Sequence, residues 1–212
     1  MIYFYLIRHG ETESNKRNIF RGRADVPLNQ TGIQQAESLA VELKPISLNM
    51  ILSSPLQRAV QTAEKISRQK SVPIIIEEDL TNISLGKWEG QPKEVIRQKF
   101  PNLYEMWIRE PEKLFFKGME PLKEVQQRAI SVIRKYQKEL SHHREAHVAV
   151  VTHRAVLKPL IAGLIGIKEP YFWKIHMDTA AYSVIRMDAQ GNPTLTMLNQ
   201  TRHLESYTSE WS

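Results

Sequence analysis

The sequence predicts an α/β protein in which a mostly parallel central sheet lies between two layers of helices, a three-layer α/β/α arrangement. Short blocks of apolar, β-branched and aromatic residues alternate along the chain with segments of helical period, and that alternation is typical of α/β folds. The chain has 212 residues, of which 42 % are hydrophobic. This is enough to bury one sizeable core, so we expect a single domain over residues 1–212.

Six short apolar runs are predicted to be the strands of this sheet, because they are rich in β-branched and aromatic residues. They cover residues 2–7, 50–53, 72–76, 147–152, 182–187 and 194–199. Turn-forming residues between Asp188 and Asn192 separate the last two runs. This predicts a hairpin at the end of the sheet.

Five segments with helical periodicity are predicted to cover the faces of the sheet. They span residues 32–43, 56–69, 92–99, 122–140 and 155–165. In the segments 32–43 and 122–140 the apolar residues fall on one face, as expected of surface helices that pack on a sheet. The periodicity is weaker between about residues 77 and 121, where aromatic residues lie among prolines and charges. We expect a small insertion there.

Composition excludes several kinds of function. The chain has no cysteine, which excludes disulfides, thiolate zinc sites and a cysteine nucleophile. Its 29 lysines and arginines are interspersed with 23 acidic residues, so the net charge of +6 favours anionic small molecules over nucleic acid. No run approaches the roughly 18 apolar residues of a membrane span, and no secretory leader is recognisable. We therefore expect a cytoplasmic protein without membrane contact.

Basic and imidazole side chains follow three of the predicted strands. Arg8 and His9 end the first strand, and His153 follows the fourth. Arg58 lies in the first turn of the helix after the second strand. The carboxyl ends of parallel strands meet at one edge of a sheet, where ligands of open α/β sheets bind. Each residue alone is typical of an ordinary boundary or surface position, but together they predict an anion site.

This set of side chains suits phosphoryl transfer. The planar guanidinium groups of Arg8 and Arg58 match phosphate oxygens and can clamp one phosphoryl group from two sides. Their charges disfavour an imidazolium, so His9 would stay neutral and nucleophilic near neutral pH. His9 would then carry a phosphohistidine intermediate, and His153 would stabilise the charge that develops on the phosphoryl oxygens.

Several segments of the chain, in order, are similar to the motifs of one enzyme family. They read LIRHGETESN, GRADVPLNQTG, SSPLQRAVQTAE, LGKWEG and VAVVTH, and the later segment FWKIHMDTAAYSVIRM fits the same pattern. The chain thus resembles the histidine phosphatase superfamily, the phosphoglycerate-mutase-like group. The resemblance implies the phosphoglycerate-mutase-like fold and a reaction that needs no metal and no cofactor.

The resemblance also implies roles for individual residues. His9 would be the nucleophile of the reaction. The residues that bind the phosphoryl group would be Arg8, Arg58 and His153. Those near the phosphate or the rest of the substrate would be Asn15, Arg21 and Gly22.

One position departs from the family pattern and bears on the activity. The general acid of the family is a glutamate four residues before the first glycine of the G-x-W-x-G motif, and that position holds Asn82 here. An amide donates hydrogen bonds but cannot transfer a proton to a leaving alkoxide, and general acid catalysis supplies roughly 10²- to 10⁴-fold in rate. Asp79 and Glu89 are nearby acids that could substitute, although both also fit ordinary structural or surface carboxylates.

Three smaller departures from the family pattern also occur, and the last of them bears on specificity. Arg154 follows His153, where the family commonly has a small residue. The segment KGMEP at 117–121 replaces a Gly-Gly-Glu-Ser pattern and keeps Glu120. Leu85 stands where phosphoserine-type members carry a polar residue such as histidine.

Two functions of different class remain open. The first is a metal-independent phosphatase that acts on a small phosphorylated metabolite, since the chain is short for a mutase of this type. Its segments look most like those of metal-independent phosphoserine phosphatases, with α-ribazole and broad-specificity phosphatases next. The second is a weakly active or non-catalytic relative that binds phosphate as the partner subunit of an active phosphatase. We expect either a homodimer or a heterodimer with a related phosphatase.

Overall fold

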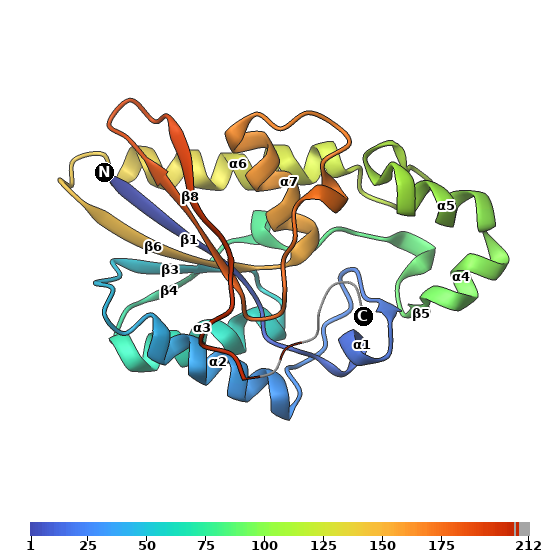
Figure 1. The fold of residues 1–212 in the computed structure, drawn as a ribbon, viewed down its shortest axis with the longest axis horizontal. Coiled ribbons are helices and arrows are strands. Elements are labelled where there is room, and N and C mark those ends of the chain that lie inside the picture. The colour runs from blue at the N-terminus through green and yellow to red at the C-terminus, as the bar shows by residue number, and fades with distance from the viewer. Residues whose placement is uncertain (206, 208–212) are drawn as a thin grey trace.

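The predicted three-layer α/β/α architecture is present in the structure, a computed structural model that describes residues 1–205 and 207 (Figure 1). A six-stranded sheet lies between two pairs of helices. The expectation of a single domain over residues 1–212 stays a prediction, and its residues 206 and 208–212 lie outside the described part of the chain.

All six predicted strands occur in the central sheet, with small differences at their ends. In sheet order they are β4 (Ile74–Ile76), β3 (Met50–Ser53), β6 (Ala146–Thr152), β1 (Ile2–Arg8), β7 (Tyr182–Met187) and β8 (Pro193–Gln200). The strands from β4 to β1 are parallel, whereas β7 pairs antiparallel with β1 and β8 pairs antiparallel with β7. The sheet is therefore mostly parallel and ends in the expected hairpin.

Four helices cover the two faces of the sheet (Figure 1). They are α2 (Gln30–Glu42), α3 (Gln57–Lys70), α6 (Leu122–Glu139) and α7 (Arg154–Ile165). Successive side chains of β1 point to opposite faces, as the period of a strand requires. Phe4 and Leu6 belong to the core beneath α6 and α7, whereas Tyr5 and Ile7 belong to the core beneath α2 and α3. No helix of the described residues is long and apolar enough to cross a lipid bilayer.

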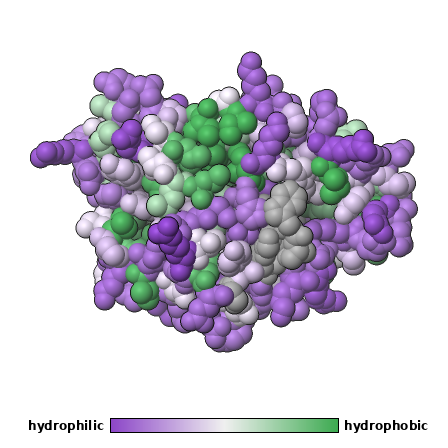
Figure 2. All heavy atoms as spheres, viewed as in Figure 1, coloured by the Kyte–Doolittle hydropathy of each residue, from purple (hydrophilic) through white to green (hydrophobic). Residues whose placement is uncertain are grey.

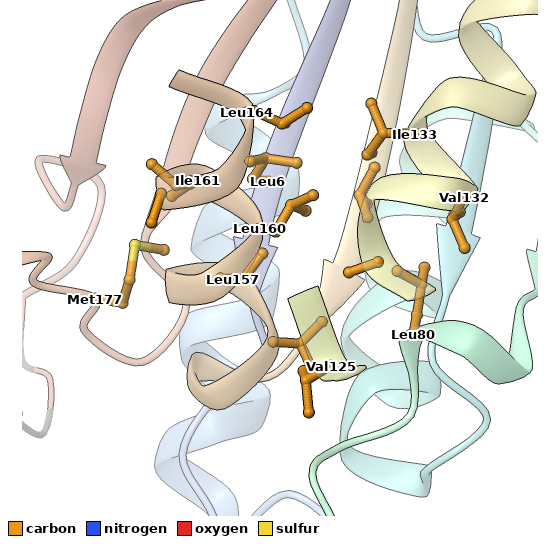
Figure 3. Close-up of a cluster of buried hydrophobic side chains, with 14 of the residues drawn as sticks. Leu6, Leu80, Val125, Val132, Ile133, Leu157, Leu160, Ile161, Leu164 and Met177 are labelled. Atoms are coloured by element: carbon orange, nitrogen blue, oxygen red, sulfur yellow. The ribbon is translucent and has the colours of Figure 1, made fainter. Parts of the chain in front are cut away.

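The core beneath α6 and α7 fixes the position of β1. Figure 3 shows Leu157 and Leu160 of α7 and Val125 and Ile133 of α6 gathered around Leu6 of β1. All five side chains are fully buried. Burial of a side chain of this kind is worth about 1.5–3 kcal/mol, so this packing holds the strand firmly between its helices. The residues that directly follow β1 are therefore also held in a fixed position.

The region expected to be an insertion, about residues 77–121, forms short elements, and its helices between residues 93 and 109 lie to one side of the sheet (Figure 1). They are η1 (Glu78–Leu80), η2 (Gly86–Trp88), β5 (Gln91–Pro92), α4 (Lys93–Lys99), α5 (Pro101–Arg109) and η3 (Pro111–Lys113). Strand β5 pairs antiparallel with β2 (Ile19–Phe20) in a second, two-stranded sheet. The predicted helix 92–99 is α4, whereas α5 was not predicted; it buries only Trp107.

Two short helices lie outside these layers, and β8 forms one edge of the central sheet. The helices are α1 (Glu13–Lys16) and η4 (Phe172–Lys174). Apolar side chains gather over the region of α7 and β8 in Figure 2, and Ile167, Met197 and Leu198 are exposed. The homodimer or heterodimer expected from the sequence stays a prediction.

The loop after β1 approaches the start of α2 too closely for a side chain at two glycines. A Cβ atom on Gly32 would lie 2.0 Å from the carbonyl oxygen of Glu11, and one on Gly10 would lie 2.5 Å from the carbonyl oxygen of Gly32. The Oδ1 of Asn29 caps α2 by accepting a hydrogen bond from the Gly32 amide at 2.8 Å. Its Nδ2 donates to Glu11 Oε1 at 2.7 Å. The loop that carries His9 is therefore held against α2.

Replacement of Gly32 by alanine should push these two backbone segments apart. We expect the Gly32→Ala variant to lose about 1–3 kcal/mol of unfolding free energy, the usual cost of overpacking. Urea unfolding measures the loss. The matched control is Gln34→Ala at an exposed position of the same helix, which should change the free energy by less than about 0.5 kcal/mol. Equal stability of Gly32→Ala and the parent chain would show that the close approach does not constrain the loop.

Candidate active site

Three neighbouring strands of the sheet end at one place. Strand β6 lies between β3 and β1, so Ser54, His9 and His153 follow adjacent strands. The His9 amide donates a hydrogen bond to the carbonyl oxygen of Thr152 at 3.0 Å. The ring centroids of His9 and His153 are 5.1 Å apart, and each residue is 1 % exposed. The structure thus brings the two predicted histidines together in a buried site.

The backbone holds His9 in one tautomer. The Nδ1 of the ring lies 2.6 Å from the carbonyl oxygen of Gly10. A carbonyl oxygen only accepts hydrogen bonds, so Nδ1 carries the proton and the neutral ring keeps its lone pair on Nε2. Burial lowers the pKa of His9 well below its usual value, and the positive charge of Arg58 is the next cause. The ring is therefore neutral at ordinary pH, with Nε2 as its nucleophilic atom.

Two buried arginines at this edge are held by backbone carbonyl groups. Arg8 is 2 % exposed, and its Nη1 donates to the carbonyl oxygen of Met177 at 2.5 Å. Arg58 is fully buried, and it donates from Nη1 to Ala24 at 2.8 Å and from Nη2 to Gly22 at 3.1 Å. Burial lowers the pKa of Arg58 to about 10, so its guanidinium group stays charged at neutral pH. Two positive charges held close to the buried histidines favour a bound anion.

His153 has one engaged ring nitrogen and one without a partner. Its Nε2 lies 2.8 Å from Ser54 Oγ. Its Nδ1 is buried and has no hydrogen-bond partner within residues 1–205 and 207. Burial lowers the pKa of His153 well below its usual value, and the charge of Arg58 lowers it further. An anion beside the ring would favour the protonated form, which donates hydrogen bonds.

The carbonyl oxygen of Gly22 links Arg58 to Asn82. Asn82 Nδ2 donates to this oxygen at 2.8 Å, and Arg58 Nη2 donates to it as well. Gly22 has a φ of +53°, and a Cβ there would lie 2.2 Å from Glu89 Oε1, so the position requires glycine. Arg23 Nε donates to the backbone carbonyl of Asn82 at 3.1 Å. The amide side chain of Asn82 is thus held in place, while its buried Oδ1 has no partner in the described part of the chain.

A small open crevice borders the two histidines. Its lining combines the histidines and Asn82 with three cationic side chains and several apolar or aromatic ones. The lining residues are His9, Ile19, Phe20, Arg21, Gly22, Asn82, Ile83, Leu85, Lys93, Trp107, His153, Arg154 and Ala155. Among the residues that the structure describes, no aspartate or glutamate belongs to this lining. The crevice therefore suits an anionic ligand with an apolar portion.

Arg21 reaches the crevice, whereas Asn15 does not belong to its lining. Arg21 Nη1 donates to Thr12 Oγ1 at 2.8 Å. Burial lowers the pKa of Arg21 well below its usual value, and the positive charge of Arg58 lowers it further. The Oδ1 of Asn15 accepts hydrogen bonds from the amide and the hydroxyl of Thr12, both at 2.9 Å. The approach of Asn15 to a phosphate, expected from the sequence, stays a prediction.

The acids near Asn82 in the sequence do not line the crevice. Glu89 Oε1 accepts a hydrogen bond from the Leu85 amide at 2.8 Å, and Asp79 lies exposed in η1. Glu120 Oε1 binds Arg128 Nε at 2.7 Å. Within residues 1–205 and 207, no three His, Asp or Glu side chains are placed to hold a metal ion. The carboxylates of Asp79, Glu89 and Glu120 therefore do not belong to the lining of the crevice.

Some contacts of the site could not be expected from the sequence. Ser54 lies in the segment SSPLQRAVQTAE beside Arg58, so its contact with His153 had a signal that the prediction did not use. The sequence around Lys93 gave no indication that this side chain would reach the crevice. It reaches the crevice because the β2–β5 pairing brings the start of α4 back to the loop after β1, where its amide donates to the carbonyl oxygen of Asn18 at 3.0 Å.

Comparisons with known proteins point to one family. The family model described as histidine phosphatase superfamily (branch 1) matches residues 4–201. Phosphoserine phosphatase 1 of Hydrogenobacter thermophilus is 34 % identical over 207 residues, which are 98 % of this chain and 96 % of that protein. The adenosylcobalamin/alpha-ribazole phosphatase of Escherichia coli is 31 % identical over 195 residues, 92 % of this chain and 94 % of that protein. The structure of YhfR from Bacillus stearothermophilus superposes with a TM-score of 0.90 at 31 % identity, covering 96 % of this chain and 99 % of that one.

The two buried histidines should make the stability depend on pH. An unfolded histidine binds a proton near pH 6.5, whereas His9 and His153 have lowered pKa values in the folded protein and bind one only at lower pH. The unfolded state therefore binds more protons below about pH 6.5, and the unfolding free energy falls as the pH falls. We expect each histidine to account for a loss of about 1 kcal/mol between about pH 7.5 and about pH 5.5.

Urea unfolding at the two pH values measures this effect. His9→Gln and His153→Gln should each remove one histidine's share of the pH dependence. His142→Gln, at an exposed position, is the control and should leave the dependence unchanged. The same pH dependence in the parent chain and both site variants would contradict the account of buried neutral rings.

Proposed function

The chain belongs to the histidine phosphatase superfamily, and from this we propose that it hydrolyses small phosphomonoesters through a phosphohistidine formed on His9. One observation carries the proposal: the buried His9 ring lies beside arginines with Nδ1 bound to the Gly10 carbonyl, which leaves Nε2 as the nucleophile. The relatives that are named as phosphatases support the reaction class.

The reaction would proceed by two displacements at phosphorus. In the first, His9 Nε2 forms a bond to phosphorus, the bond from phosphorus to the leaving oxygen breaks, and that oxygen takes up a proton from solvent water. In the second, water attacks the phosphohistidine, releases one proton, and frees inorganic phosphate and the ring. Phosphorylation at Nε2 places positive charge on the imidazole, and the hydrogen bond from Nδ1 to the Gly10 carbonyl stabilises that charge.

The fixed positive charges would stabilise the transferring phosphoryl group. Arg8 and Arg58 are already oriented by backbone carbonyls, so they need little rearrangement as charge develops on the phosphoryl oxygens. Arg21 borders the same crevice. His153 would become protonated beside the dianion, since a neighbouring negative charge raises a depressed histidine pKa. Together these groups would hold the phosphoryl group in line with His9.

We expect Asn82 to slow the first displacement, because it stands in the place of a proton donor. It lines the crevice together with His9, at the position where the family carries its general acid. Its Nδ2 binds the Gly22 carbonyl, and an amide supplies no proton to the leaving oxygen. A poor leaving group would therefore depart slowly. The same observation favours a second candidate function, a non-catalytic relative that binds phosphate as the partner subunit of an active phosphatase.

The substrate that we propose is a small phosphorylated metabolite. Leu85 lines the crevice, where phosphoserine-type relatives carry a polar residue. An apolar wall at this position disfavours recognition of phosphoserine itself, because a buried charged group without a partner is costly.

Hydrolysis should depend on His9 and not on added metal. We expect the parent chain to release phosphate from p-nitrophenyl phosphate in the presence of EDTA, and His9→Ala to lower kcat by roughly 10³-fold or more, as for other nucleophile deletions. Acid-free quenching followed by mass spectrometry should find the phosphoryl group on the peptide that contains His9. His142→Ala is the control and should keep the parent rate. A parent-like rate for His9→Ala would reject the phosphohistidine route.

Restoring a carboxyl group at position 82 should restore general acid catalysis. We expect Asn82→Glu to raise kcat on an alkyl phosphate by on the order of 10-fold or more, and to raise it less on an aryl phosphate, whose oxygen leaves with less need of a proton. The Gly22 carbonyl beside this position favours the protonated carboxyl, which can donate to it as Asn82 Nδ2 does. Steady-state kinetics on the two phosphates measures the gain.

The matched control is Asn82→Gln, which has the length of glutamate but keeps the amide. It should show no gain on either phosphate. Equal alkyl phosphate rates for Asn82→Glu and Asn82→Gln, together with substantial turnover by the parent chain, would mean that another group already donates the proton. Equal rates with no turnover by the parent chain would favour the partner-subunit function.

A further inference from the structure

We propose that Arg154 and Lys93 bind a second anionic group of the substrate, so that the preferred substrates are short phosphomonoesters that also carry a carboxylate or a second phosphate. This inference rests on the proposed phosphatase function and names its substrate class. Both side chains line the crevice that contains His9, and neither is needed to hold the phosphoryl group in the mechanism above.

Arg154 brings a positive charge to the crevice from the start of α7. It is the first residue of the helix and follows His153 directly. Its guanidinium group lies 5.7 Å from the centre of the Trp173 ring. Its charge contributes to the lowered pKa of Arg21, so the two cations lie near each other. The crevice therefore has more than one positive charge along its wall, which favours a ligand with more than one negative charge.

Lys93 brings a second positive charge from a different part of the chain. It is the first residue of α4, in the segment between the strands of the main sheet. Its Nζ donates to Asn18 Oδ1 at 2.9 Å, and its amide donates to the Asn18 carbonyl. These contacts tie it to the loop that also carries Arg21. Two cations from unrelated elements therefore border one crevice.

The rest of the lining defines what can lie between the two anionic ends. Phe20, Leu85 and Trp107 supply apolar surface that suits a short carbon chain. No carboxylate borders the crevice in the described part of the chain, so nothing there matches a substrate ammonium group. The lining thus favours a substrate whose second group is negatively charged over one whose second group is neutral. It favours the neutral group, in turn, over a positively charged one.

Three phosphates of nearly equal size test this order. They are phosphoglycolate, 2-hydroxyethyl phosphate and phosphoethanolamine, which carry a carboxylate, a hydroxyl and an ammonium group beside the phosphate. We expect kcat/KM of the parent chain to be on the order of 10-fold or more higher for phosphoglycolate than for 2-hydroxyethyl phosphate, and lowest for phosphoethanolamine. The ratio of the first two values is the specificity that the proposal assigns to Arg154 and Lys93.

The variants Arg154→Gln and Lys93→Gln should each lower this ratio toward 1. Two matched controls remove the same charge elsewhere: Arg144→Gln at the opposite end of β6, and Lys99→Gln at the far end of α4, both exposed. The controls should keep the parent ratio. Equal kcat/KM for phosphoglycolate and 2-hydroxyethyl phosphate in the parent chain, or an unchanged ratio in both Gln variants, would overturn the proposal.

A binding measurement separates this proposal from the proposed function. If the parent chain turns over none of the three compounds, the phosphatase function fails, and calorimetric titration of phosphoglycolate and 2-hydroxyethyl phosphate then decides the binding claim. Tighter binding of phosphoglycolate that is lost in Arg154→Gln would uphold the second anion site. Equal affinities would reject it.

Discussion

The hydrogen bond from His9 Nδ1 to the carbonyl oxygen of Gly10 is the contact on which the chemistry of the site depends. It fixes the tautomer, so the nucleophilic lone pair stays on Nε2 in a ring that burial and positive charge keep neutral. The bond exists because the loop after β1 is held in one place. Gly10 and Gly32 let that loop touch the start of α2, and the packed core holds β1 beneath it. The packing that stabilises the sheet therefore also fixes the orientation of the His9 imidazole.

The second constraint is the amount of positive charge at the carboxyl edge of the sheet. Arg8 and Arg58 are buried there, and each donates to a backbone carbonyl that orients its guanidinium group. A carboxylate in this position would neutralise the guanidinium groups and compete with a phosphate for them. The acids of the region instead bind the surrounding chain, as Glu89 binds the Leu85 amide. The positive charge beside the histidines therefore favours an anion in the site.

The central sheet, its four main helices and the residues at its carboxyl edge could be predicted from the sequence. Short apolar runs indicate the strands, helical periodicity indicates the helices, and the edge residues directly follow the strands. Strands β2 and β5 could not be predicted, since two residues each show no period, and their pairing depends on a contact between distant segments. For the same reason the place of Lys93 was not predictable. The substitution at Asn82 could be read from the sequence, but its contact with Gly22 could not, because the positive φ at Gly22 and the bond from Arg58 to the same oxygen exist only in the folded chain.

The protonation state of His9 is the central claim, and nitrogen NMR of the imidazole measures it directly. A long-range ¹H–¹⁵N spectrum of the labelled parent chain at about pH 6, with the His9 signals assigned by their loss in His9→Gln, reports which ring nitrogen carries the proton. The account predicts a neutral ring protonated at Nδ1, with no phosphate present. An imidazolium at that pH, or a neutral ring protonated at Nε2, would contradict it.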